Sequence, residues 1–154
     1  MKNSNSIWDI IFGETITDPM FGDLLLNQRG TERFWEGNIV FAPTNQNIGI
    51  TLWHLEGRVD NAQKNFYREL ENRYSEMLNE IGPCLLREFL KKNDLGDDCD
   101  IWKVFKFVGF TFPTASGLIK GSFEWDMFYS YDEGKPPFLV EMLNWQPEEC
   151  YSGE

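Results

Sequence analysis

Two acidic side chains in the C-terminal part of the chain have a spacing that could support acid–base chemistry. Glu124 and Asp126 lie two residues apart in a segment that alternates apolar and polar residues, as a β-strand does. At strand rise both point from the same face, about 7 Å apart along the backbone. Such a carboxylate pair can act as general acid and base, as in glycoside hydrolysis, when a cleft raises the pKa of one member. On an exposed face the pair only adds charge, and we favour that second interpretation.

Four aspartates crowd a short segment that ends at Asp100, and oxygen-rich clusters of this kind can bind calcium. They are Asp94, Asp97, Asp98 and Asp100. The spacing differs from that of an EF-hand loop, because Gly96 lies among the acids and the twelfth position is Phe105 instead of glutamate. We interpret the segment as a solvated loop. Neither a G-x-G-x-x-G motif nor a phosphate loop occurs in the sequence, so we expect no cofactor.

The histidine and cysteine content argues against a metal centre. His54 is the only imidazole, and no serine lies in a G-x-S-x-G motif that it could activate. The cysteines Cys84, Cys99 and Cys150 are widely spaced and form no C-x-x-C pair. This arrangement predicts reduced thiols in a cytoplasmic protein rather than a disulfide framework. A zinc site would need an unusual ligand set, so we expect no metal.

Hydrophobic periodicity predicts the strands that position these side chains. Strand patterns occur at 33–42, 48–55, 101–112, 118–129 and 138–145, with a further apolar run at 21–27. The continuous apolarity of 101–112 predicts a central strand buried on both faces. Within 118–129 the residues expected to face inward are Ile119, Phe123, Trp125, Met127 and Tyr129. The acidic tail from Gln146 is expected to fray.

Between these strands the apolar residues recur in steps of three or four, which is typical of an amphipathic helix. Asp60 with Gln63 resembles a capping box at its start. Pro83 is expected to kink the helix or split it into 60–81 and 83–93. The sequence therefore predicts one α+β domain over residues 1–154. We expect a largely antiparallel sheet of about five or six strands, with a long kinked helix (about 60–93) on one face.

The chain of 154 residues has a formal net charge of −11, and its acids are unevenly distributed. Residues 94–154 hold twelve acids and four bases, whereas residues 60–93 hold six of each. A negative field repels phosphate backbones and anionic membranes and attracts basic surfaces. We therefore expect a basic protein partner and neither nucleic-acid nor membrane binding. The alternative is that the acidity serves solubility alone.

Several sequence motifs resemble those of a known group of proteins. They are F-G-D-L-L-L at 21–26, F-W-E-G-N-I-V-F at 34–41, I-G-I-T-L at 48–52, F-Y-R-E-L-E-N-R-Y at 66–74 and F-E-W-D at 123–126. Together they resemble a broad group of small bacterial domains, some of which look like immunity proteins of polymorphic toxin systems. The resemblance implies a cytoplasmic protein that occludes a toxin or another partner. It supplies no catalytic residues.

We therefore expect a non-enzymatic interaction protein of immunity or inhibitor type that binds a basic protein, such as a toxin domain. The residues expected to bind this partner are Glu124, Asp126, Tyr129, Tyr131, Asp132 and Glu133. An acidic inhibitor suits the basic cleft of a nuclease, because its field speeds association. Two alternatives remain open. One is a small hydrolase that uses Glu124 and Asp126, and the other is a structural homodimer that pairs through an exposed strand edge.

Overall fold

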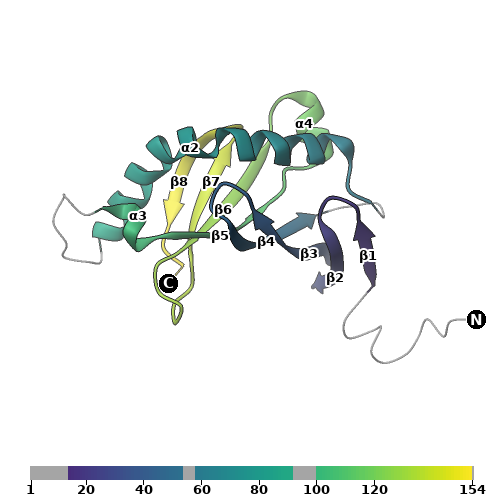
Figure 1. Ribbon diagram of the computed structural model, residues 1–154, viewed down its shortest axis with the longest axis horizontal. Helices are drawn as coiled ribbons and strands as arrows, with labels where there is room; N and C mark the ends of the chain where they lie inside the picture. Colours follow the sequence, from purple (N-terminus) through teal and green to yellow (C-terminus); the bar gives the residue numbers. More distant parts are fainter. Residues whose placement is uncertain (1–13, 54–57, 92–99, 154) are drawn as a thin grey trace, which may run out of the picture.

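The computed structural model describes residues 14–53, 58–91 and 100–153, which form one eight-stranded sheet with helices against one face (Figure 1). The strands are β1 (Thr15–Asp18), β2 (Gly22–Arg29), β3 (Glu32–Phe41), β4 (Gln46–Trp53), β5 (Lys106–Thr111), β6 (Glu124–Ser130), β7 (Phe138–Leu143) and β8 (Gln146–Tyr151). The helices are α2 (Asn61–Leu90), α3 (Ile101–Val104) and α4 (Ala115–Lys120). The predicted α+β class, in the order strands, long helix, strands, is confirmed.

The strands lie side by side in chain order, and each neighbouring pair is antiparallel except β4 and β5. Antiparallel neighbours need only short turns, whereas a parallel pair needs a long crossover, which α2 provides here. The sheet is therefore mixed, and the expected number of five or six strands is wrong. The two unexpected strands are the edges of the sheet, namely β1, which has four residues, and β8, which has six. The tail from Gln146 does not fray, since it pairs with β7 as β8.

The long helix starts as the sequence predicts but does not divide. The Asp60 carboxylate accepts the backbone N–H of Ala62 at 2.7 Å, and the Gln63 side chain accepts that of Asp60 at 3.2 Å. This capping box satisfies N–H groups that have no partner within the helix. The split at Pro83 is wrong, because α2 continues through it to Leu90. Proline removes one backbone donor, and the carbonyl that it leaves unpaired belongs to exposed Asn79, where water can reach it.

Two predicted strands begin with a helical turn instead. In 101–112 the Asp100 side chain caps α3 by accepting the backbone N–H of Trp102 at 3.2 Å, and β5 follows. In 118–129 the Thr114 hydroxyl caps α4, which ends at Gly121 with a left-handed backbone (φ 80°). The inward position predicted for Ile119 is wrong, since this side chain lies on α4 and is 76% exposed. Trp125, Met127 and Tyr129 of β6 do face the core.

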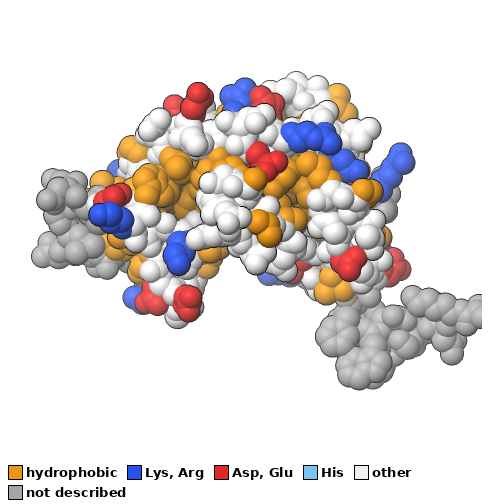
Figure 2. All heavy atoms as spheres, viewed as in Figure 1, with side chains coloured by type: hydrophobic (Ala, Val, Ile, Leu, Met, Phe, Trp, Pro, Cys, Tyr) orange, Lys and Arg blue, Asp and Glu red, His pale blue; other side chains and the backbone are white. Residues whose placement is uncertain are grey.

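Side chains between the sheet and α2 form the hydrophobic core. The stripe of α2 contributes Phe66, Leu70, Tyr74, Met77, Ile81, Leu85 and Phe89. The strands contribute Leu24, Trp35, Phe41, Ile50, Leu52, Phe107, Phe110, Trp125, Met127, Tyr129, Phe138, Val140 and Met142, among others. Apolar side chains accordingly gather in the band between the helix and the strands below it (Figure 2). Because this one face holds the core, the opposite face of the sheet is left for other roles.

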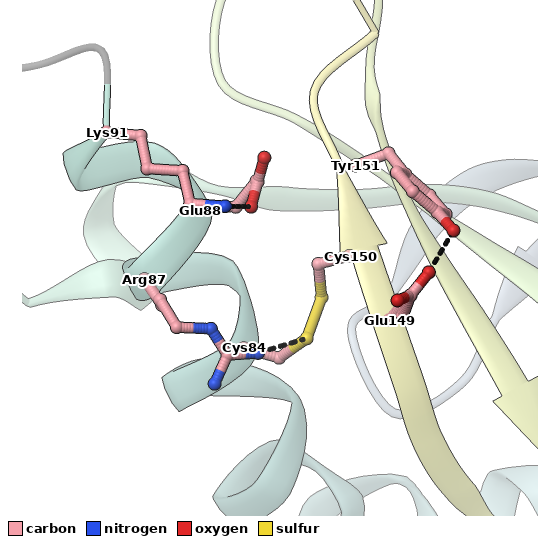
Figure 3. Close-up of a disulfide and its surroundings, with 7 residues drawn as sticks. All are labelled: Cys84, Arg87, Glu88, Lys91, Glu149, Cys150 and Tyr151. Carbon is pink, nitrogen blue, oxygen red and sulfur yellow. Dashed lines mark hydrogen bonds and ion pairs between the residues drawn. A yellow bond between two sulfur atoms is a disulfide. The ribbon is translucent and has the colours of Figure 1, made fainter.

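A disulfide joins α2 to the edge strand β8. It links Cys84 to Cys150 across 66 positions of sequence, with their Cα atoms 6.0 Å apart (Figure 3). The expectation of reduced thiols is therefore wrong for these two residues. Their separation in sequence gives no sign of the pairing, which arises because β8 completes the sheet beneath the C-terminal half of α2. Cys99 lies outside the described residues, as do His54, Asp94, Asp97 and Asp98.

Candidate functional site: the acidic face of the sheet

The sheet face opposite α2 is built by strand register. Residues directly opposite one another on neighbouring strands share a face, so the pairing defines rows that run across the sheet. One such row consists of Leu25, Glu36, Thr51, Thr111, Asp126, Glu141 and Glu149. Its members alternate along each strand with the core residues, so they lie on the face away from α2. The row is polar over most of its length and acidic at its β8 end.

Four carboxylates occupy neighbouring positions of β6, β7 and β8 at that end of the sheet, and we call them the acidic face: Glu124, Asp126, Glu141 and Glu149. Asp126 and Glu149 both pair directly with Glu141, from either side of β7. Directly opposed side chains have Cβ atoms about 5 Å apart. Glu124 precedes Asp126 by two residues on β6 and therefore lies on the same face. The spacing of Glu124 and Asp126 is thus as the sequence predicts, and two further carboxylates join them.

Partial burial and mutual repulsion both act on these carboxylates. Burial raises the pKa of Asp126, as does the charge of Glu124, while a hydrogen bond from Thr111 opposes the rise. The pKa of Glu141 is raised by desolvation and then by the negative charges of Asp126 and Glu149. Among the ion pairs of the described residues, none involves the four carboxylates. The acidic face therefore carries negative charge that the described part of the chain does not neutralise.

An apolar row runs beside the acidic face. The register places Phe128, Leu139 and Tyr151 opposite one another on β6, β7 and β8. Phe128 and Leu139 are half-buried, and Tyr151 is 41% exposed. The Tyr151 hydroxyl donates to the Glu149 carboxylate, and this hydrogen bond raises the pKa of Tyr151 to about 12. The apolar row therefore places nonpolar side chains directly beside the acidic face.

The centre of the same sheet face lacks side chains where β4 and β5 meet. Gly49 pairs with Gly109, and a Cβ atom at Gly109 would lie 2.8 Å from the carbonyl oxygen of Gly49. Only glycine allows this approach without a backbone shift. A shallow hollow of about 380 Å³ lies over Gly49, and Glu36 and Thr51 are among the residues that line it. Since these two belong to the polar row described above, the hollow adjoins the acidic face through that row.

The tyrosines predicted to bind a partner differ in position. Tyr129 is fully buried, and its hydroxyl lies 3.2 Å from that of Tyr74 on α2. Its predicted role as a surface anchor is therefore wrong, because the alternation of β6 turns it toward α2 while Asp126 and Phe128 face away. Tyr131 is half-buried, and its ring packs against those of Phe89, Phe105 and Phe138.

Asp132 and Glu133 do not join the acidic face. Both are exposed in the loop between β6 and β7, which projects from the end of the sheet (Figure 1). Asp132 follows Asp126 by six residues, about 20 Å along an extended strand. Its carboxylate accepts the backbone N–H of Gly134 at 3.0 Å, as in an Asx turn. Asp132 thus shapes the loop, and both acids lie apart from the four carboxylates.

Sequence reasoning missed Glu141 and Glu149 as members of the site. The strand at 138–145 is evident from its pattern, but which residue of it faces Asp126 depends on register, which the sequence does not reveal. For β8, the available signal is the alternation at its end. Cys150 is apolar and suits the core face, whereas its neighbours Glu149 and Tyr151 suit the opposite face. That signal is short and is weakened by Pro147.

The carboxylate pair proposed for a hydrolase is not enclosed by the described residues. Glu124 is exposed and Asp126 half-buried, and both face away from the helices. In the described ranges, no group of three or more His, Cys, Asp or Glu side chains is placed to hold a metal ion. Nor does any helix in these ranges have the length and apolar character needed to cross a membrane. Comparison of the chain with protein-family models, curated proteins and solved structures finds no match to any of them.

Proposed function

We propose that this chain is a non-enzymatic interaction protein that binds a basic protein partner through the acidic face. The observation that supports the proposal is the set of four carboxylates on adjacent strands, none of which belongs to an ion pair of the described residues. Glu141 has a like charge directly opposite on each side, in Asp126 and Glu149. Repulsion of this kind is relieved when Lys or Arg side chains approach. The like charges of the acidic face destabilise the free protein, and a bound basic surface would remove that destabilisation.

The apolar row would slow the dissociation of such a partner. Charge complementarity mainly increases the rate of encounter and the specificity, whereas buried nonpolar contact slows dissociation. Phe128, Leu139 and Tyr151 lie beside the carboxylates on the same three strands. With a formal net charge of −11, the whole chain also attracts a basic partner at long range. We expect affinity to fall as salt concentration rises.

The immunity or inhibitor type is the form of this function that we favour. The motif resemblance to immunity proteins of toxin systems supports it, as does the fit between an acidic surface and a basic toxin domain. An immunity protein meets its toxin in the cytoplasm, and we propose that location. The hydrolase alternative lacks support, because no described element encloses Glu124 and Asp126.

A binding titration with matched variants tests the proposal. The probe is fluorescein-labelled decalysine, and the variants are Asp126→Asn with Glu141→Gln on the acidic face and Glu76→Gln with Glu80→Gln on the exposed side of α2. Each double variant removes two negative charges, so their effects on the overall field match. At roughly 0.7 kcal/mol for each surface ion pair, we expect the first variant to weaken binding about tenfold. Equal losses in the two variants would show that only net charge matters and would refute the assignment to this face.

A further inference from the structure

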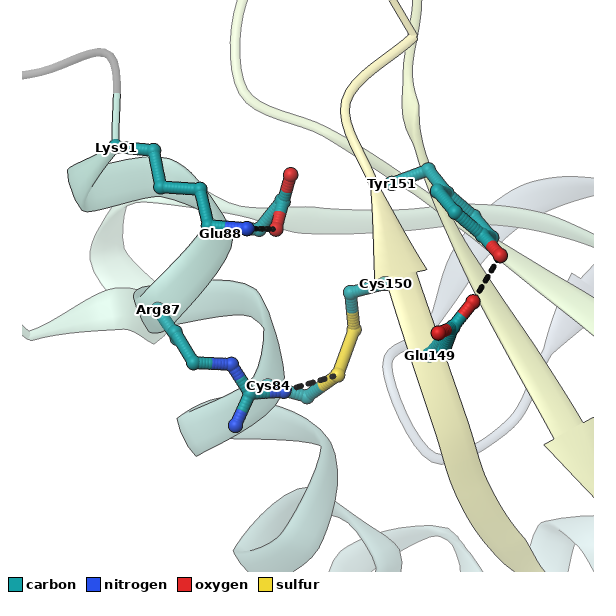
Figure 4. A network of polar contacts seen from close by, with 7 residues as sticks. All are labelled: Cys84, Arg87, Glu88, Lys91, Glu149, Cys150 and Tyr151. Carbon is teal, nitrogen blue, oxygen red and sulfur yellow. Dashed lines mark hydrogen bonds and ion pairs between the residues drawn. A yellow bond between two sulfur atoms is a disulfide. The ribbon is translucent and has the colours of Figure 1, made fainter.

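The disulfide holds the strand that completes the acidic face. Cys150 points from β8 toward α2, where it meets Cys84, whereas its neighbours Glu149 and Tyr151 lie on the other side of the strand (Figures 3 and 4). Cys84 and Cys150 are 7% and 8% exposed, so the bond is largely shielded. One covalent bond thus ties the helix to the strand that supplies one of the four carboxylates and one member of the apolar row.

We propose that the Cys84–Cys150 disulfide is a redox-sensitive latch that regulates partner binding by the acidic face. The inference rests on the proposed function, because it concerns the same site. In the oxidised protein β8 is fixed beneath α2, with Glu149 beside Glu141. In the reduced protein β8 keeps only its noncovalent contacts, so Glu149 and Tyr151 are no longer held in place for a partner.

Several features of β8 weaken its noncovalent pairing and make it depend on such a bond. It is an edge strand, so it pairs with β7 alone. The pairing is irregular, with a register shift between Glu141 and Met142. Pro147 within β8 has no N–H to donate. An edge strand with a disrupted ladder has few hydrogen bonds to lose, and we therefore expect it to open first when the disulfide breaks.

The surroundings of the sulfur atoms favour one direction of cleavage. The Arg87 guanidinium lies 3.8 Å from the Cys84 Sγ atom (Figure 4). A nearby cation stabilises a thiolate, so Cys84 is the better leaving group and Cys150 the preferred point of attack. A dithiol reductant attacks the Cys150 sulfur through one thiolate, forms a mixed disulfide and releases Cys84 as a thiolate. The second thiol of the reductant then displaces Cys150, so that the reductant is oxidised to a disulfide and both cysteines are reduced.

The cytoplasmic location that we propose is consistent with a disulfide that is reversibly reduced. Disulfides in that compartment are usually transient and serve redox sensing or catalysis. The bond would form under oxidising conditions and break under reducing ones. The position of β8, and with it partner binding by the acidic face, would then depend on the redox state. The same bond in an oxidising compartment would act as a permanent brace, so the readiness of the bond to be reduced is part of the test.

The experiment uses the full chain, oxidised and after treatment with dithiothreitol. Alkylation followed by intact mass counts the free thiols, hydrogen exchange follows the amides of 146–151, and decalysine titration measures binding. We expect one alkylated thiol in the oxidised form and three in the reduced form, faster exchange in 146–151 on reduction, and a decalysine Kd raised about threefold, as for loss of one exposed ion pair. Cys150→Ala should match the reduced protein and show no response in exchange or binding to dithiothreitol. Cys99→Ala should respond as the unmodified chain does.

The outcomes separate the latch from the proposed function. Unchanged exchange in 146–151 after full reduction overturns the latch, even if decalysine binds both forms. Three alkylated thiols without reductant, or a bond that native conditions with dithiothreitol do not cleave, also overturn it. If β8 loosens on reduction but decalysine binds neither form, the proposed function fails, and with it the regulatory role of the disulfide. If exchange increases but binding is equal in the two forms, the function stands and the latch is refuted.

Discussion

Replacement of Glu141 by glutamine should stabilise the fold at neutral pH. Glu141 lies directly opposite Asp126 on one side and Glu149 on the other, so one substitution removes two like-charge pairs. Such pairs destabilise a sheet by roughly 0.5 kcal/mol each, which gives an expected gain of about 1 kcal/mol in the free energy of unfolding. Glutamine keeps the size of the side chain, so packing should change little.

The pH dependence provides the sharpest test of this reasoning. The pKa of Glu141 is raised in the folded protein by partial burial and by neighbouring carboxylates. Between the unfolded pKa and the higher folded pKa, the folded state binds more protons than the unfolded state, so stability falls as pH rises through that interval. The destabilisation is complete above the folded pKa and absent below the unfolded value. Glu141→Gln should therefore be more stable than the unmodified chain at pH 7 and equal to it at about pH 3.

Urea unfolding measures the effect directly. With an m value of about 2 kcal/mol per molar, a gain of 1 kcal/mol moves the midpoint up by about 0.5 M at pH 7. Glu76→Gln, on the exposed side of α2, is the matched control and should leave the midpoint nearly unchanged. A lower midpoint for Glu141→Gln at pH 7, or a gain that persists at pH 3, would refute the account of repulsion on this face.

Two further substitutions test how the structure holds the site together. Gly109→Ala should lower the free energy of unfolding by about 1–3 kcal/mol, because the new Cβ would meet the Gly49 carbonyl oxygen at 2.8 Å, whereas Gly134→Ala, with 3.6 Å to its nearest neighbour, should have little effect in the same denaturation assay. The double variant Cys84→Ala with Cys150→Ala opens a covalent loop of 66 positions and should lower the free energy of unfolding by about 4 kcal/mol under oxidising conditions, whereas Cys99→Ala should not. A double variant as stable as the oxidised chain would show that the disulfide does not stabilise the fold.

Periodicity predicts this fold to the extent that each element buries one face. The helical stripe from Phe66 to Phe89 and the alternation around Trp125 are clear because the core faces are almost wholly apolar. The edges gave weaker patterns, since β1 has four residues and β8 combines acids with Pro147. Pro83 misleads because the packing of α2 on the sheet outweighs the loss of one hydrogen bond at its exposed side.

The candidate site was only half predictable, because it depends on pairing between strands. The i, i+2 spacing of Glu124 and Asp126 fixes their common face from the sequence alone. Whether Glu141 faces Asp126 or its neighbour depends on register, and Glu149 depends on a strand that has little pattern. For Tyr129 the sequence supports two conflicting predictions: parity with Trp125 and Met127 predicts a core position, whereas the acidic residues nearby suggest an aromatic anchor for a partner. Its complete burial decides for the core.

The acidic face differs from what stability alone would produce. A sheet face exposed only to water gains from alternating signs on facing strands, because opposite charges attract and like charges repel. Here the ion pairs of the described residues lie elsewhere: Lys64 with Asp18, Arg73 with Glu69 and Lys91 with Glu88. The core on the other face and the Cys84–Cys150 bond can offset the repulsion, but they do not explain it. The basic partner that we propose would explain it, and the proposal predicts two effects of opposite sign from one substitution: Glu141→Gln should make the free protein more stable and the complex weaker. A carboxylate that served the fold alone could not produce that combination.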